Sequence, residues 1–181
     1  MILGRYAGYA NSTGLNNFAS NNGALMCNVS GSQNFAGGYL TLTANTTGYN
    51  NVAIGPAAMR SNTSGINNIA LGQCALALNT TGGTNIAIGQ CAMRCHDTTG
   101  NNNLALGYSA LRENEGSFNV ALGSVASFCN TTGCYNTTLG YAAGKCTTTG
   151  CHNFSVGQCA GVSNETSSYN ISIGQHSNYC G

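Results

Sequence analysis

The chain has 181 residues, of which only 5% are Asp, Glu, Lys or Arg, and its formal net charge is +1. Ordinary soluble domains carry about 25% charged residues, so helices covered by surface ion pairs are excluded. Five scattered cations cannot form the basic surface that nucleic acids require, and no apolar run is long enough to cross a bilayer. With 42% hydrophobic residues, the chain also lacks the composition of a disordered protein. The composition predicts a soluble, β-rich protein built for structure or binding.

An internal repeat with a period of about 17 residues runs along the chain. Nine glycines end Ala-Ile-Gly-like motifs at this spacing, with one step longer and one step shorter: Gly38, Gly55, Gly72, Gly89, Gly107, Gly123, Gly140, Gly157 and Gly174. Counting back by the same spacing reaches Asn21 and Gly4 in phase. We call each of these residues the anchor of its repeat unit. Residues 1–181 are therefore predicted to form a single repeat domain without a linker.

The columns of the repeat indicate a strand and a turn. An asparagine stands four residues before the anchor in all ten units that reach this position: Asn17, Asn34, Asn51, Asn68, Asn85, Asn103, Asn119, Asn136, Asn153 and Asn170. An apolar, a small and a second apolar residue usually follow, which is the period of a half-buried strand. Ala usually stands three residues past the anchor, and a segment such as Asn45-Thr46-Thr47-Gly48 closes the unit.

A unit of this length is too short for a helical repeat and fits two short strands with two turns. Glycine at the anchor suits a corner with positive φ, and the glycine of Asn-Thr-Thr-Gly is expected to take a positive φ as well. Stacked units predict an all-β parallel β-solenoid of about ten to eleven rungs. Because rungs lie about 4.8 Å apart, the asparagines are expected to form a hydrogen-bonded ladder. The alternative is that each asparagine only adopts a left-handed turn conformation.

Some repeat units of the chain resemble repeats of known protein families. The segments 51–59 (NVAIGPAAM) and 85–93 (NIAIGQCAM) resemble the head repeats of trimeric autotransporter adhesins. The longer unit with Asn-Thr-Thr-Gly resembles repeats of phage and giant-virus tail-fibre proteins. The resemblance covers residues 4–174 and implies a left-handed β-roll, assembled as a homotrimer, that serves as a surface fibre or adhesin. The adhesin head unit is shorter than the unit of this chain, and ten cysteines are unusual for a bacterial adhesin.

The cysteines fall into three columns. Cys134 and Cys151 stand eleven residues past the anchor, only in units that also carry Cys129 or Cys146 six past it. This co-occurrence predicts the loop-closing disulfides Cys129–Cys134 and Cys146–Cys151, with vertical pairs such as Cys129–Cys146 as the alternative. Two more pairs, Cys74–Cys95 and Cys159–Cys180, are suggested because both have the same separation in sequence. So many cysteines indicate an oxidising compartment.

No catalytic, cofactor or metal site is predicted. The segment from Cys91 to Asp97 holds several metal-ligand types, but it lacks a paired knuckle, and stacking alone explains its cysteines. Four cations stand five residues past the anchor, as a solvated edge or as a sparse stripe for a polyanionic glycan: Arg60, Arg94, Arg112 and Lys145. Six glycosylation sequons are expected in the outer turn, where a eukaryotic secretory host could modify them: Asn11, Asn28, Asn45, Asn62, Asn79 and Asn130.

The sequence predicts a structural protein. We expect a fibre or adhesin module outside a cell or on a virion, which contacts other copies of itself and, through its surface, a glycan or protein receptor. Neither end of the repeat carries an atypical capping unit, so head-to-tail stacking into a filament is also expected. The alternative is a monomeric ice-binding solenoid, suggested by the repeated Thr-Thr turns and the cysteine pairs.

Overall fold

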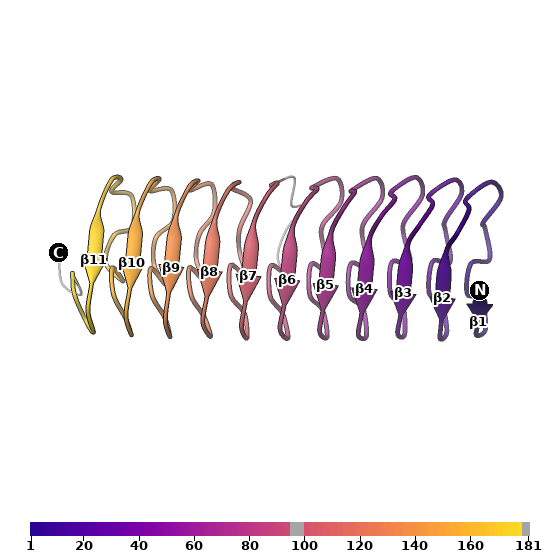
Figure 1. The fold of residues 1–181 in the computed structure, drawn as a ribbon, viewed down its shortest axis with the longest axis horizontal. Coiled ribbons are helices and arrows are strands. Elements are labelled where there is room, and N and C mark those ends of the chain that lie inside the picture. The colour runs from indigo at the N-terminus through magenta and orange to yellow at the C-terminus, as the bar shows by residue number, and fades with distance from the viewer. Residues whose placement is uncertain (95–99, 179–181) are drawn as a thin grey trace.

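The computed structural model describes residues 1–94 and 100–178 as a β-solenoid in which the chain winds along one long axis (Figure 1). Eleven parallel strands form a single sheet in chain order. No helix occurs in these two ranges, so the prediction of an all-β parallel β-solenoid is confirmed. The strands are β1 Ile2–Leu3, β2 Phe18–Ser20, β3 Phe35–Gly37, β4 Val52–Ile54, β5 Ile69–Leu71, β6 Ile86–Ile88, β7 Leu104–Leu106, β8 Val120–Leu122, β9 Thr137–Leu139, β10 Phe154–Val156 and β11 Ile171–Ile173.

The repeat sets the register of the sheet. Val52 pairs with Ile69, one unit further along, and the same pairing recurs between successive strands. The longer and the shorter unit keep this register, because Ile86 pairs with Leu104 and Leu104 pairs with Val120. The extra and the missing residue are therefore absorbed outside the strands, and the stack continues in phase.

Within residues 1–94 and 100–178 each rung contains one strand, so the prediction of two strands per unit is wrong. The segment after the anchor is a series of turns, in which residues two and four past the anchor have positive φ. In the rung of Gly55 these are Ala57, with φ of 57°, and Met59, with φ of 49°. A residue in the left-handed region reverses the chain locally and cannot belong to an extended strand.

The two recurrent glycines are needed for different reasons. The anchor Gly72 has φ of 133°, and a Cβ there would lie 2.7 Å from the carbonyl oxygen of Gly89, so the predicted corner is confirmed. The turn residue Gly48 does not have positive φ, which corrects the expectation for Asn-Thr-Thr-Gly. A Cβ on Gly48 would instead overlap Oδ1 of Asn45 and lie 2.5 Å from the carbonyl oxygen of Gly65. Glycine is required in this turn because two polar groups occupy the space of a side chain.

The interior is lined mainly by small residues. The central residue of most strands is an alanine with no exposed surface, such as Ala53, and the alanines three past the anchor, such as Ala58, are equally buried. The residue four past the anchor divides the molecule into two regions. In the first region, with anchors Asn21 to Gly107, this residue is a buried leucine or methionine: Leu25, Leu42, Met59, Leu76, Met93 and Leu111. In the second region, with anchors Gly123 to Gly157, it is Ser127, Gly144 or Gly161.

The asparagines four before the anchor form the predicted ladder. The backbone N–H of Asn51 donates to Oδ1 of Asn34 at 3.1 Å, and equivalent bonds of 2.9–3.1 Å join every successive pair from Asn17 to Asn170. Nδ2 of Asn51 also donates to the carbonyl oxygen of Gly65, in the turn of the following rung, at 2.8 Å. We call this column the first asparagine ladder. It ties each rung to the next at two points.

Candidate interaction surface

The outward face of the sheet is an extended apolar surface. In each three-residue strand the middle side chain points into the core, while the first and third point outward and are half-buried or exposed. Ile54, Leu106 and Phe35 expose 44%, 43% and 38% of their surface. The outward residues from β2 to β11, which we call the sheet face, contain no charged side chain: Phe18, Ser20, Phe35, Gly37, Val52, Ile54, Ile69, Leu71, Ile86, Ile88, Leu104, Leu106, Val120, Leu122, Thr137, Leu139, Phe154, Val156, Ile171 and Ile173.

The small interior residues explain why the large ones lie outside. Alanines fill the space between the strand and the turns across the rung, which leaves no room there for Ile, Leu or Phe. The outward side chains instead contact their vertical neighbours, and the rings of Phe18 and Phe35 stack with centroids 4.4 Å apart. Contiguous exposed apolar surface of this kind marks an interaction site in soluble proteins.

An aromatic column lies just before strands β8 to β11, in the second region and the rung of Gly174. Phe118, Tyr135, His152 and Tyr169 stand five residues before their anchors and stack in parallel, with centroids 4.9, 4.9 and 5.0 Å apart. Each has a positive φ, and each side chain is exposed. We call this column the aromatic ladder. Sequence analysis did not identify it, although four aromatic rings at the spacing of the repeat were the signal.

The sequon asparagines of the outer turn point inward and form a second ladder, which corrects the expectation that they could carry glycans. The five from Asn11 to Asn79 bond to one another, and Asn130 bonds to Asn114 in the same column. Asn28, Asn45, Asn62, Asn79 and Asn130 are buried, and Asn11 is half-buried. Nδ2 of Asn62 donates to Oδ1 of Asn45 at 2.8 Å and to the carbonyl oxygen of Gly65 at 3.2 Å. A glycan on such a nitrogen would have to break both bonds and occupy filled space, so the folded chain offers no glycosylation site at the buried positions.

The second asparagine ladder is interrupted in the second region. Thr147 takes the place of an asparagine there, between Asn130 and Asn164. As a result Oδ1 of Asn130 and Nδ2 of Asn164 are buried without a hydrogen-bond partner. A buried polar atom without a partner destabilises a fold by about 1–3 kcal/mol, so this interruption is a weak point of the stack.

The eight described cysteines are free thiols, so this structure contains neither of the expected loop-closing disulfides, Cys129–Cys134 and Cys146–Cys151. The expected pairs Cys74–Cys95 and Cys159–Cys180 involve Cys95 and Cys180, which lie outside the described residues.

Cys134 and Cys151 instead replace serine in a column of hydrogen-bond acceptors. The backbone N–H of Ser117 donates to Sγ of Cys134 at 3.3 Å, and the N–H of Cys134 donates to Sγ of Cys151 at 3.1 Å. Ser32 and Ser168 accept the equivalent bond at 3.0 and 2.9 Å in their own rungs. The thiol therefore acts here as a substitute for a hydroxyl group.

The cationic column is not a continuous stripe. Arg60, Arg94 and Lys145 are exposed, but Arg112 is half-buried and places its guanidinium carbon 5.3 Å from the centroid of the Phe128 ring. Uncharged side chains such as Ala77 and Phe128 interrupt the column between these residues. This spacing fits a solvated edge better than a surface built for a polyanion.

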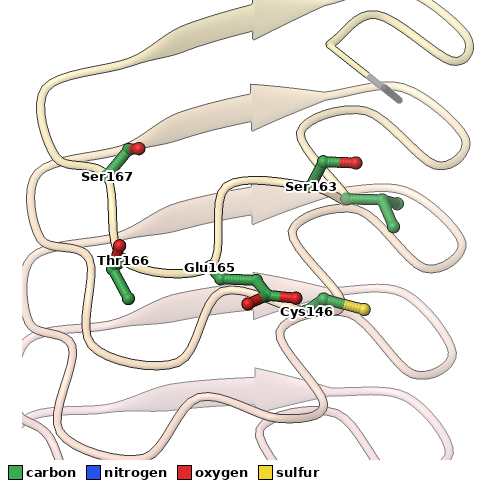
Figure 2. A pocket seen from close by; sticks show the side chains of 6 residues that line it. Cys146, Ser163, Glu165, Thr166 and Ser167 are labelled. Atoms are coloured by element: carbon green, nitrogen blue, oxygen red, sulfur yellow. The ribbon is translucent and has the colours of Figure 1, made fainter. Parts of the chain in front are cut away.

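One shallow hollow of about 480 Å³ lies beside the outer turn of the second region, lined by Cys146, Val162, Ser163, Glu165, Thr166 and Ser167. Figure 2 shows the Glu165 side chain extending toward Cys146, with Ser163 and Ser167 at opposite ends of the turn. Within residues 1–94 and 100–178, no three His, Cys, Asp or Glu side chains are arranged to hold a metal ion. The candidate ligands Cys95, His96 and Asp97 lie outside the described residues.

Three comparisons with known proteins gave no match, whether with family models, with curated proteins or with solved structures. In the described ranges no helix has the length and apolar character needed to cross a membrane. The sheet face, the two asparagine ladders and the aromatic ladder are therefore the features from which function must be argued.

Proposed function

We propose that the chain is a structural module of an extracellular or virion-surface fibre, in which parallel copies associate through the sheet face as a homotrimer. The observation that carries this proposal is the uncharged apolar sheet face, which runs along every rung from β2 to β11. Nine spacings of about 4.8 Å make this strip roughly 43 Å long. Burial of so large an apolar surface stabilises association by removing it from water.

Further copies of the same chain are the occupants that fit this face best. Because the outward side chains repeat with the register of the strands, a parallel second copy would meet each apolar row with an equivalent row. The absence of charged side chains in the strip removes any like-charge penalty for such self-association. The resemblance to adhesin heads and tail fibres supports three copies and a role in binding a surface glycan or protein. Head-to-tail contacts between modules would be a second way to extend the fibre.

The test measures the mass of the particle in solution. Light scattering after size-exclusion chromatography should give three chain masses, each of 18.4 kDa. A double variant, Ile54→Lys with Leu106→Lys, places charges on the sheet face at exposed positions and should dissociate the particle. Thr81→Lys adds a charge on the exposed outer turn instead and should leave the mass unchanged. A wild-type particle of one chain mass at micromolar concentration would rule the proposal out.

An ice-binding solenoid is the second candidate, because a column of exposed hydroxyl groups follows the outer turn, including Thr47, Ser64 and Thr81. The neighbouring column is less available, since Oγ1 of Thr46 and Oγ1 of Thr63 each donate to a backbone carbonyl at 3.1 Å. A single exposed column at a turn is narrower than a flat ice-like array. Thermal hysteresis that is lost in Thr47→Lys with Thr81→Lys would favour this candidate over the fibre.

A further inference from the structure

Six of the eight described cysteines lie directly above or below another cysteine. The three pairs are Cys74 with Cys91, Cys129 with Cys146, and Cys134 with Cys151, each separated by one repeat unit. Cys27 and Cys159 have no such neighbour, because the residues one rung away from Cys27 are Ala10 and Ala44, and those next to Cys159 are Ala142 and His176. The pairs therefore need an explanation that the isolated cysteines do not.

Backbone hydrogen bonds hold two of these pairs in register between the same two rungs. The N–H of Cys129 donates to the carbonyl oxygen of Lys145, the residue before Cys146, at 3.0 Å. The N–H of Cys134 donates to Sγ of Cys151 at 3.1 Å. Residues in register on neighbouring strands lie about 4.8 Å apart, which falls inside the range of about 4.4–6.8 Å between the Cα atoms of a disulfide.

We propose that Cys129–Cys146 and Cys134–Cys151 form cross-rung disulfides under oxidising conditions. The two bonds would staple the rungs of Gly123 and Gly140 together on both sides of the outer turn. These rungs have Ser127 and Gly144 in place of the leucine or methionine of the first region, and Thr147 interrupts the second asparagine ladder between them. The staples thus lie where a large apolar core side chain and one link of the second asparagine ladder are missing.

The sulfur of Cys151 lies against the backbone of its vertical neighbour Cys134, with an N–H donating to Sγ at 3.1 Å. Sγ of Cys134 donates to the carbonyl oxygen of Thr132 at 3.4 Å and accepts the N–H of Ser117, which lies one rung away on the side opposite to Cys151. The Cys134 side chain therefore has to rotate before it can bond to Cys151. The vertical neighbour is the partner that lies one rung away on the same side.

The oxidation balances with glutathione disulfide as the oxidant. The thiolate of one cysteine attacks a sulfur of glutathione disulfide, which releases one glutathione thiolate and leaves a mixed disulfide on the protein. The vertical neighbour then attacks the protein sulfur of this mixed disulfide and releases the second glutathione. The protein pair loses two electrons and two protons, and glutathione disulfide is reduced to two glutathione molecules.

Tryptic mapping distinguishes cross-rung from loop-closing disulfides, because cleavage after Lys145 separates Cys129 and Cys134 from Cys146 and Cys151. The full chain is treated with glutathione disulfide, alkylated, denatured and digested, which yields peptides 113–145 and 146–181. Cross-rung bonds link these two peptides to each other, with fragment ions that assign Cys129–Cys146 and Cys134–Cys151. Loop-closing bonds leave two unlinked peptides, each with an internal disulfide. Unlinked peptides, or full alkylation of all four thiols, would overturn the proposal.

Matched variants test the stapling effect. Oxidation should raise the Tm by about 5–10 °C, as expected from closing a loop of about 17 residues. Cys27→Ser, which removes a cysteine without a vertical neighbour, should keep the whole shift and the link between the peptides. The double variant Cys129→Ser with Cys146→Ser should keep only the link through Cys134 and Cys151 and lose part of the shift. A shift retained without any of the four cysteines would contradict the proposal.

Discussion

The first and second regions follow the same backbone path with different interiors. In the first region, Leu76 and its equivalents fill the space four residues past the anchor and are fully buried. In the second region this space belongs to Ser127, Gly144 and Gly161, and the facing strand residue changes from alanine to Thr138 or Ser155. The exchange is complementary, because a Cβ on Gly144 would lie 2.6 Å from Cγ2 of Thr138.

The surfaces of the two regions differ in the opposite sense to their cores: the second region has the more polar core and the more aromatic surface. In the first region, the column five before the anchor is mostly polar, and Nδ2 of Asn50 donates to Oδ1 of Asn67 at 3.2 Å. In the second region, the aromatic ladder occupies this column. Stacked aromatic pairs contribute about 0.5–1.5 kcal/mol each beyond area burial. In the second region, stacked surface rings therefore provide part of the apolar contact between rungs that core side chains provide in the first region.

This difference shows which contacts define the solenoid and which can be exchanged. The first asparagine ladder continues through both regions with unchanged bond lengths, and successive strands remain in register throughout. The core side chains change between regions, and the second asparagine ladder loses a link at Thr147. The path of the chain therefore depends on backbone and asparagine hydrogen bonds, while the core contributes stability.

The largest effect is expected from truncating the core of the first region. Leu76→Ala leaves a cavity among fully buried neighbours and should lower the free energy of unfolding by about 2–5 kcal/mol. Ser127→Ala, at the equivalent position of the second region, removes one hydrogen bond to Thr138 and should cost about 0.5–1.5 kcal/mol. Urea unfolding measures both. Equal losses of unfolding free energy would show that the apolar core of the first region contributes no more stability than the polar core of the second.

The first asparagine ladder should be equally important in both regions. Asn85→Ala and Asn153→Ala each remove the Oδ1 that accepts the backbone N–H of the next rung. Each should lower the free energy of unfolding by about 1–3 kcal/mol, because the buried N–H of Asn103 and the half-buried N–H of Asn170 lose their acceptors. The control Gln90→Ala changes an exposed side chain and should stay within about 0.5 kcal/mol of wild type. A much smaller loss for Asn153→Ala would mean that the ladder is not the common element.

Repair of the second asparagine ladder should stabilise the second region. Thr147→Asn restores a donor for Oδ1 of Asn130 and an acceptor for Nδ2 of Asn164, both of which are buried without a partner. We expect the free energy of unfolding to rise by about 1–2 kcal/mol. Thr149→Asn changes an exposed residue of the same turn and is the matched control. A loss of stability in Thr147→Asn alone would show that the interruption is a packing requirement of this region.

The smallest effect concerns the reduced thiol of Cys129. Burial first, then the neighbouring Cys146 and Glu113, raise the pKa of Cys129, and Lys145 partly opposes them. Because the unfolded chain loses this proton at lower pH, the stabilising contribution is complete below the unfolded pKa. It is lost as pH rises through the folded pKa, above about pH 8.5.

Iodoacetamide labelling against pH measures the Cys129 effect directly. Cys129 should react more slowly in the folded protein than in urea, since the thiolate is the reacting form. Cys146→Ser removes one of the groups that raise the pKa and should partly restore the rate. A folded protein that labels at the unfolded rate throughout this pH range would contradict the expected shift.

The sequence alone was sufficient for the features that depend on the period. A regular repeat places equivalent residues one rung apart, so the parallel stack, its register and the first asparagine ladder all follow from the columns. The anchor glycines were recognisable because a corner that approaches the next rung excludes a Cβ. These inferences require only that neighbouring rungs have the same backbone.

Only the tertiary structure decided which side chains point inward. The turns after the anchor depend on residues with a left-handed backbone conformation, such as Leu76 and Cys74. Leucine and cysteine rarely have a positive φ, so this conformation could not be predicted from the sequence. The positive φ values exclude a second strand and direct the alanines and Leu76 into the core. The large strand residues then lie on the sheet face. The same geometry turns the sequon asparagines inward, where Gly48 and its equivalents leave space for them. Side-chain direction depends on the dihedral angles of each rung, whereas periodicity reports only which residues are stacked.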